Sequence, residues 1–251
     1  MKNKILKKIV GMFGYKLADK NHIKNDRMLE NSSYLDNKKI LNFLFKKKKI
    51  NYLIQIGAND GLRFDSLNYF IKKYKTKSLL VEPIKENFEE LKKNYKEYKH
   101  ISFENSAISV NNNISYLYKV NPLKLNNYSG DHFIGITSFD INHLLKHGVK
   151  KKDIVKEKIN SISINNLITK HNINKFDLLF IDAEGYDADI VGDFLKSSQI
   201  RPVIIFEYFH IPYKKFENLL DQLKERKYIF FSLSENLFCF PEKDNPFVNF
   251  D

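Results

Sequence analysis

The stretch Asn51-Tyr-Leu-Ile-Gln-Ile-Gly-Ala-Asn-Asp-Gly61 decides the fold of this chain. Tyr52–Ile56 is a short apolar run with the length of a buried parallel strand, and it ends at a turn bounded by Gly57 and Gly61. A helical pattern follows over Leu62–Tyr74. This order is typical of a nucleotide pocket, because glycine lets the backbone approach a ligand and the start of a helix offers free N–H groups. A tight turn without a ligand is the alternative that this segment alone leaves open.

A second strand supports the nucleotide pocket. Ser78–Val81 is another short apolar run, and it ends in Glu82-Pro83 before a helical pattern over Ile84–Tyr98. An acidic residue at this place accepts hydrogen bonds from both hydroxyls of a ribose. Glu82 is therefore the first predicted cofactor residue. The alternative is a charge that stabilises the start of the following helix.

The same alternation of strands and helices continues toward the C-terminus. Further strands are predicted at Ile101–Phe103, Phe176–Ile181 and Pro202–Phe206. A helix is predicted over Tyr213–Arg226, and a closing hairpin over residues 228–240. The pattern predicts an α/β fold, with a mostly parallel sheet between helices on both faces. Ligands of such folds bind at the carboxyl ends of the strands.

An insertion interrupts the alternation. Residues 114–120 read as a strand that we expect to pair with residues 158–164, but residues 121–148 show no steady period. A long segment of this kind is typical of a lid or binding loop, so we expect residues 121–150 to cover the substrate, which would accept the transferred group. A surface insertion without this role is the alternative. The segment contains His132, His143 and His147, whose spacing does not indicate a zinc site. No metal ligands are therefore assigned.

Acidic side chains follow the strand at Phe176–Ile181. Asp182 and Glu184 stand beside Gly185, and carboxylates crowded at a strand end are costly unless they bind something. We expect Asp182 to reach the amino group of a cofactor or a metal, and Glu184 to face the acceptor. Polar residues also follow the next strand, among them Glu207 and His210.

The positive charge of the chain lies at its N-terminal end. Residues 1–50 carry 14 Lys and Arg against 4 Asp and Glu, a net charge of +10, whereas residues 51–251 carry +2. We therefore predict a basic helical arm over residues 1–50 and one catalytic domain over residues 51–251. A nucleic-acid-binding catalytic domain would carry its own basic face, so no nucleic acid partner is expected. Residues 1–20 alternate apolar and basic residues, which suits either packing on the main domain or weak contact with a membrane surface.

Cysteine content and hydropathy bound the cellular location. Cys239 is the only cysteine, which excludes an intramolecular disulfide and suits a reducing compartment. No stretch reaches the roughly 18 apolar residues of a membrane span. We expect a cytoplasmic protein; a peripheral position at the inner face of the membrane is the alternative.

Four motifs together carry a family resemblance. They are Ile-Gly-Ala-Asn-Asp-Gly at residues 56–61, Val-Glu-Pro at 81–83, Asn-Ser-Ala at 105–107 and Phe-Ile-Asp-Ala-Glu-Gly-Tyr-Asp at 180–187. In this order and spacing the chain resembles the FkbM family of S-adenosylmethionine-dependent methyltransferases over about residues 51–210. The resemblance implies a Rossmann-like class I methyltransferase fold with seven strands, one of them antiparallel. It also implies O-methylation of a hydroxylated small molecule, commonly a sugar or sugar-linked group in surface-polysaccharide biosynthesis.

The resemblance also implies cofactor-binding residues. The methionine part of S-adenosylmethionine would pass four residues of the first turn, Glu82 would hold the ribose, and Asp182 would lie nearest the amino group and sulfonium. The turn residues are Gly57, Ala58, Asn59 and Gly61, and the residues expected to border the adenine are Asn105, Ser106 and Ala107. Tyr186 and Asp187 stand where the family usually has His-Glu, which leaves the general base open.

The expected reaction is in-line displacement of the sulfonium methyl by an acceptor oxygen, in which alignment supplies most of the rate. The acceptor hydroxyl must still lose a proton, and the predicted catalytic residues are His210, Glu184 and Glu207. A divalent cation held by Asp182, Glu184 and Glu207 is a less favoured alternative.

The sequence is also compatible with two other classes of function. A nicotinamide-dependent oxidoreductase uses a similar strand and acidic residue, but its loop requires Gly-x-Gly-x-x-Gly, and Ala58, Asn59 and Asp60 lie between the two glycines here. A non-catalytic cofactor-binding module recruited by its basic arm is the third reading. The oligomeric state is not predicted.

Overall fold

The computed structural model describes residues 35–63, 65–110, 115–129 and 132–244. The chain divides into two compact units, residues 1–40 and 41–251. The predicted arm extends to residue 50, so its last ten residues belong to the larger unit. The membrane contact predicted for residues 1–20 lies outside the described residues.

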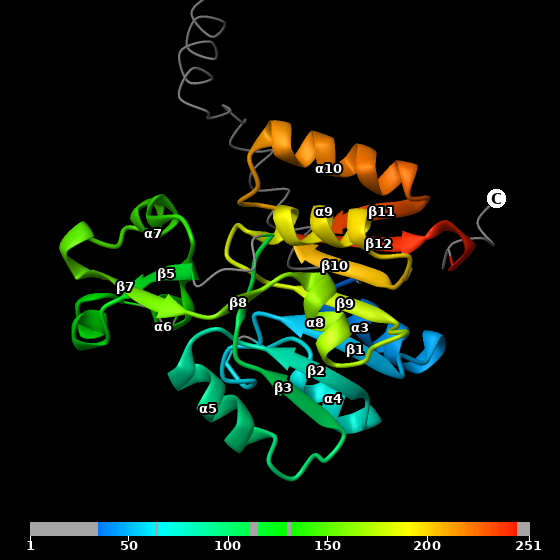
Figure 1. Cartoon of the computed structure of the whole chain (residues 1–251), viewed down its shortest axis with the longest axis horizontal. Coiled ribbons are helices and arrows are strands. Elements are labelled where there is room, and N and C mark those ends of the chain that lie inside the picture. Colours follow the sequence, from blue (N-terminus) through cyan, green and yellow to red (C-terminus); the bar gives the residue numbers. More distant parts are fainter. Residues whose placement is uncertain (1–34, 64, 111–114, 130–131, 245–251) are drawn as a thin grey trace, which may run out of the picture. The chain divides into compact units, whose positions relative to one another are not determined.

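A seven-stranded sheet forms the centre of the larger unit (Figure 1). The strand order is β11-β12-β10-β9-β1-β2-β3; six strands run in the same direction, and β12 runs antiparallel to them. The strands are β1 Tyr52–Ile56, β2 Lys77–Val81, β3 Ile101–Glu104, β9 Leu178–Ile181, β10 Val203–Glu207, β11 Tyr228–Leu233 and β12 Asn236–Pro241. The strand order and directions agree with the seven-stranded Rossmann-like fold that the resemblance implies, and the hairpin predicted at the end of the chain is confirmed as β11 and β12.

Apolar side chains on one face of the sheet build the main core. Ile54 and Ile56 of β1 are buried there against helices α8 Ile164–Lys170, α9 Asp187–Ser197 and α10 Tyr213–Glu225. Figure 1 shows α9 and α10 side by side. Because side chains alternate along a strand, Gln55 faces the other side, where its Nε2 donates to Asp65 Oδ1 at 3.0 Å.

The helix after the first turn begins later than predicted. It is α4, Asn68–Tyr74, rather than Leu62–Tyr74. Asp60 Oδ1 accepts hydrogen bonds from the backbone N–H groups of Leu62 and Arg63, and Asp65 Oδ1 accepts one from Leu67. These side chains occupy amides that would otherwise enter a helix, so the chain continues as a loop along the site. The next helix, α5 Lys85–Asn94, is also shorter than the predicted Ile84–Tyr98.

The insertion between β3 and β9 is structured rather than a simple loop. Its three-stranded sheet consists of β5 Ser115–Val120, β6 Thr137–Ser138 and β7 Ile154–Ile159. The short helices are η2 Pro122–Asn127, α6 His132–Gly135, α7 Ile141–Lys146 and η3 Lys151–Asp153. The expected strand pairing forms, but β5 pairs with residues 154–159, because residues 161–162 form β8 and pair instead with β4 Ala107–Ile108. Figure 1 shows this insertion beside the main sheet.

Hydrophobic contacts also give the insertion a core of its own. Val120, Ile136, Leu144 and Val149 are buried together. The absence of a clear period in the sequence therefore reflects elements of two to six residues, which are too short to repeat an apolar pattern. The remaining described elements are α3 Asn37–Phe43, η1 Leu44–Lys48 and η4 Glu242–Asp244.

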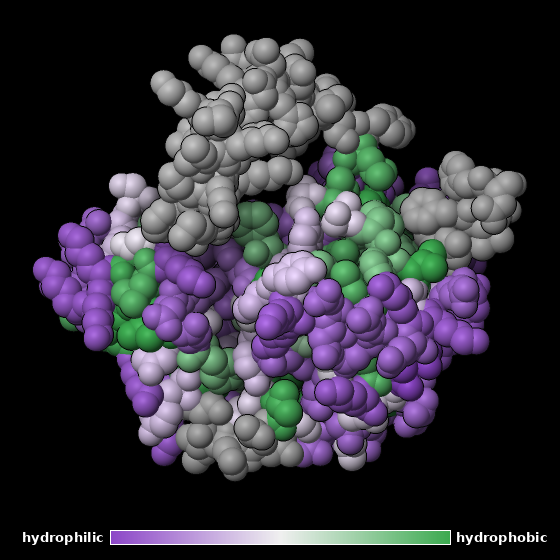
Figure 2. Space-filling view, turned by 90° about the horizontal axis from the view of Figure 1, so that it is seen from above, coloured by the Kyte–Doolittle hydropathy of each residue, from purple (hydrophilic) through white to green (hydrophobic). Residues whose placement is uncertain are grey.

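On the face drawn in Figure 2, hydrophilic residues cover much of the described part, interrupted by apolar areas. Among the described residues, every helix is too short or too polar to cross a lipid bilayer.

Candidate active site

Two adjoining cavities lie at the carboxyl ends of the central strands. The first cavity, of about 220 Å³, lies at the ends of β1, β2 and β9 and is lined by residues that include Gly57, Glu82 and Asp182. The second cavity, of about 410 Å³, is lined by His147, Glu207, His210 and their neighbours. Asp182, Glu184 and Asn236 line both. A ligand in one cavity is therefore within reach of a ligand in the other.

Gly57 allows the ends of three strands to converge on the first cavity. Its φ is +81°, and a Cβ at this position would lie 1.9 Å from the carbonyl oxygen of Asp182. The N–H groups of Gly57 and Ala58 both donate to the carbonyl of Val81 at 3.0 Å. The glycine is thus required by the approach of β1 to the end of β9, in addition to any approach of a ligand.

Glu82 joins the first turn to the end of β2. Its Oε2 accepts a hydrogen bond from the N–H of Asn59, and its Oε1 accepts one from the N–H of Ile84, both at 2.9 Å. Glu82 is 5% exposed, and burial raises the pKa of its carboxyl group to about 7. Asn59 has a φ of +48°, an unusual conformation for a residue other than glycine. The carboxylate therefore stabilises the turn while it lines the cavity.

Most of the predicted cofactor residues come together at the first cavity. Seven of the nine line it, namely Gly57, Ala58, Asn59, Glu82, Ser106, Ala107 and Asp182. Gly61 and Asn105 are not among its described lining residues. A Cβ on Gly61 would lie 2.5 Å from Leu91 Cδ1, so this glycine permits helix α5 to pack on the turn. Asn105 Nδ2 donates to the backbone carbonyls of Glu82 and Pro83, so Asn105 supports the wall from behind.

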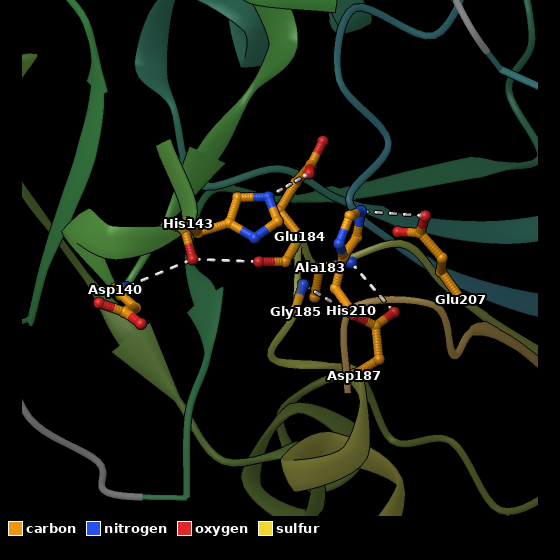
Figure 3. Close-up of polar contacts among 9 residues, drawn as sticks. Asp140, His143, Ala183, Glu184, Gly185, Asp187, Glu207 and His210 are labelled. Carbon is orange, nitrogen blue, oxygen red and sulfur yellow. Dashed lines mark hydrogen bonds and ion pairs between the residues drawn. The ribbon is translucent and has the colours of Figure 1, made fainter. Parts of the chain in front are cut away.

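A strained loop presents Glu184 between the cavities. Glu184 has a φ of +49°, and its carbonyl accepts a hydrogen bond from Ser138 Oγ at 3.0 Å. Asp187 is fully buried and accepts hydrogen bonds from the N–H groups of Ala183 and Gly185 (Figure 3). Asp187 thus closes the loop and is the first residue of α9. Strain of this kind is maintained where the surrounding contacts impose it, often at functional sites.

Carboxylates crowd the boundary of the two cavities. Burial raises the pKa of the Asp182 carboxyl group to about 8, and repulsion from the charges of Glu184 and Asp187 adds to this shift. The side chain is nevertheless open to solvent on the side of the cavity. Burial, followed by repulsion from Asp182, also raises the pKa of Glu207 to about 8. Such a cluster is stabilised by a positively charged ligand.

The three predicted catalytic residues lie together, and the structure adds a histidine. Buried His143 places its Nε2 3.0 Å from Glu184 Oε2, and His210 Nε2 lies 3.6 Å from Glu207 Oε1 (Figure 3). Burial and the neighbouring His143 lower the pKa of His210. His143 is separated from Glu184 by 41 residues, so its place at the site could not be assigned from sequence.

Other described residues at the cavities were not predicted. The first cavity is also lined by Asp65, Thr137 and Phe139, and the second by Glu235. Asp65 stands in a stretch expected to be helical, where a loop carries it to the cavity instead. Thr137 and Phe139 come from the insertion, whose short elements gave no signal of their direction.

The sequence matches the profile of a known protein family. The sequence profile of the methyltransferase FkbM domain matches residues 55–230, which is more than half of the chain. No curated protein matches the chain.

Several solved structures are distantly similar. One is a methyltransferase from Geobacter sulfurreducens, with 9% identity, a TM-score of 0.43, and coverage of 96% of this chain and 97% of that one. An O-methyltransferase from Bacillus cereus in complex with SAH has 9% identity, a TM-score of 0.45, and coverage of 94% and 97%. The SAH-bound Podospora anserina methyltransferase PaMTH1 has 10% identity, a TM-score of 0.46, and coverage of 90% and 96%.

Proposed function

Because this chain belongs to the FkbM family of S-adenosylmethionine-dependent methyltransferases, we propose that it methylates a hydroxyl oxygen of a small molecule, a sugar or a sugar-linked group of a surface polysaccharide. One observation carries this proposal: two cavities share Asp182 and Glu184. A donor in the first cavity and an acceptor in the second would meet at these residues. Because the family is one of methyltransferases, we no longer consider the nicotinamide-dependent oxidoreductase.

The first cavity suits S-adenosylmethionine. Glu82 stands at the end of β2, where its carboxylate would accept hydrogen bonds from the ribose hydroxyls. Ser106, Ala107 and Ile108 would border the adenine. Asp182 would lie nearest the amino group and the sulfonium, and both of these groups carry positive charge. A positive ligand would offset the burial and the repulsion from Glu184 that raise the pKa of Asp182 to about 8.

The second cavity suits a polar acceptor. Its volume of about 410 Å³ is within the range of roughly 300–1,000 Å³ that small-molecule sites occupy. Its walls offer hydrogen-bonding groups from Glu207, His210 and Asn236. Several acceptors of hydrogen bonds around one cavity match a ligand with several hydroxyl groups. This is the chemical reason to prefer a sugar over an apolar natural product.

In the proposed transfer the acceptor oxygen attacks the methyl carbon in line with the sulfur. The C–S bond breaks as the C–O bond forms, the sulfonium becomes the neutral thioether of S-adenosylhomocysteine, and the hydroxyl proton leaves to a base. We assign Glu184 as that base because it lines both cavities, whereas Glu207 and His210 line the second cavity without lining the first. Alignment of the reactants is worth roughly 7–11 kcal/mol at best, and it supplies the larger part of the rate.

Two measurements test this function. Isothermal titration with S-adenosylhomocysteine and, separately, with NAD should show binding of the first compound alone. Tritiated methyl transfer from S-adenosylmethionine should then label acceptors in a panel of nucleotide sugars and glycan fragments, with a matched panel of protein and RNA as controls. Label that enters protein or RNA while the sugar panel stays unlabelled would contradict the proposal.

A further inference from the structure

Three histidine rings meet at the edge of the second cavity. His143 lies in α7, His147 follows the last residue of that helix, and His210 lies three residues beyond β10. Each offers one ring nitrogen, and these three atoms lie within 4.8 Å of one another. His143 and His147 are four residues apart, so the helix places them on the same side. The fold therefore brings together a set that residue spacing alone did not indicate.

The arrangement of the rings matches a site with three histidine ligands. The ring centroids are 4.7 Å apart for His143 and His147, 4.9 Å for His143 and His210, and 5.1 Å for His147 and His210. Zinc binds histidine nitrogen at roughly 2.0–2.1 Å with tetrahedral angles, which places the ring centroids about 5 Å apart and the ligand nitrogens about 3.3 Å apart. The centroids already have this spacing. Rotation of the rings would bring the nitrogens inward.

Carboxylates stand where supporting residues of a metal site are expected. Glu184 contacts Nε2 of His143, and Glu207 lies near Nε2 of His210 (Figure 3). Histidines that bind a metal commonly donate their second ring N–H to a carboxylate, which fixes the ring and makes it a better ligand. Packing of aromatic rings is the competing explanation for the triangle. Ring packing alone gives no reason for a carboxylate at the second nitrogen of two rings.

We propose that His143, His147 and His210 bind one divalent transition metal ion, with zinc as the best match to three imidazoles. His147 and His210 line the second cavity, so the fourth ligand position would open into it. This site differs from the all-carboxylate site for a divalent cation considered from the sequence, since imidazole selects zinc, cobalt or nickel over magnesium.

The role of the ion rests on the proposed function. An acceptor hydroxyl at the fourth position would bind the ion through its oxygen, and the positive charge would favour loss of the hydroxyl proton to Glu184. The methyl transfer itself is unchanged. The binding site, by contrast, is independent of the acceptor and can be tested without any methyl donor.

The test is metal binding by the full, untagged chain after dialysis against a chelator. Isothermal titration with Zn²⁺, in the absence of donor and acceptor, should give one ion per chain, and Co²⁺ should give the visible absorption bands of a tetrahedral site. His147→Ala should weaken binding at least tenfold, and Glu207→Gln should weaken it about 10- to 100-fold. His100→Ala is the matched control, since His100 immediately precedes β3, at the opposite end of the strands. It should bind Zn²⁺ as the unchanged chain does.

Titration with S-adenosylhomocysteine and circular dichroism on every variant separate loss of a ligand from loss of fold. His143→Ala removes a buried ring, so His147→Ala, which changes a less buried residue, is the decisive variant. The proposal is wrong if the unchanged chain binds S-adenosylhomocysteine but no Zn²⁺, or if His147→Ala and His143→Ala both keep the unchanged affinity. Zinc binding without binding of S-adenosylhomocysteine would support the metal site and count against the proposed function.

Discussion

The two cavities are built in different ways. The first depends on backbone geometry at the ends of neighbouring parallel strands, where Gly57 meets the carbonyl of Asp182 and Glu82 binds the N–H groups of Asn59 and Ile84. The second depends on side chains brought from separate regions, among them His143 of the insertion and His210 beyond β10. The difference shows that the first cavity follows from local backbone geometry, whereas the second is formed only when the insertion and the residues beyond β10 come together.

Charge also distinguishes the cavities. In the first, Glu82 is satisfied by two backbone donors. At the boundary and in the second, burial and then repulsion from neighbouring carboxylates raise the pKa of Asp182 and of Glu207, and three histidines lie close by. Groups that repel one another in this way favour a cationic ligand and proton transfer. Substitutions in the first cavity or at the boundary of the two cavities test this difference.

The largest effect is expected at the boundary. Glu184→Gln removes the proposed base and should lower kcat about 10²- to 10⁴-fold, because proton transfer by a positioned group contributes that much. Binding of S-adenosylhomocysteine should change by less than about threefold, since the amide keeps the size of the side chain. Glu97→Gln, an exposed change beyond α5, is the control. A kcat within twofold of the unchanged enzyme would rule out Glu184 as the base.

The second largest effect is expected from a change of the backbone contact at the first cavity. Gly57→Ala places a Cβ 1.9 Å from the carbonyl oxygen of Asp182, so the free energy of unfolding should fall by at least about 3 kcal/mol. Gly148→Ala is a matched control, because Gly148 also has a positive φ, +85°, but no atom lies within 4 Å of its added Cβ. That change should lower stability by about 1–2 kcal/mol. Urea denaturation of both variants measures the difference, and equal losses would refute the role of the contact.

Glu82 of the first cavity should make the stability of the protein depend on pH. The unfolded chain loses this proton near pH 4.5 and the folded chain near pH 7, so unfolding releases a proton between these values. Stability should therefore fall as pH rises from about 4.5 to about 7, by at most about 3 kcal/mol from this group. Glu82→Gln should remove that part of the slope in urea denaturation at a series of pH values. Parallel curves for the two proteins would show that Glu82 titrates alike in the folded and unfolded states.

The smallest effect is expected behind the wall of the first cavity. Asn105→Ala removes two hydrogen bonds to the carbonyls of Glu82 and Pro83, which should lower the free energy of unfolding by about 1–2 kcal/mol. Affinity for S-adenosylhomocysteine should change by less than about threefold, because Asn105 supports the wall without lining the cavity. A loss of affinity of tenfold or more would restore Asn105 as a direct cofactor residue, as the family resemblance implies.

Prediction from sequence succeeded where a feature depends on nearby residues. β1 was predicted with its bounds, and the closing hairpin was found, because each is a short apolar run bounded by turn residues. The helix at Leu62 was wrong, since Asp60 and Asp65 bind backbone amides that a period of apolar residues does not reveal. Gly61 was correctly placed in the turn after β1 and Asn105 directly after β3, but spacing could not show which way each of them faces.

The amino-acid sequence by itself determined the order of strands and helices, the turn after β1 and the carboxylates at the strand ends, because these follow from the local pattern of apolar, glycine and acidic residues. Only the tertiary structure decided that His143 lies beside Glu184 and His210, and that two cavities share one wall. The physical reason is that these contacts join residues tens of positions apart. Their distances are set by how the insertion packs on the ends of β9 and β10, which no local pattern specifies.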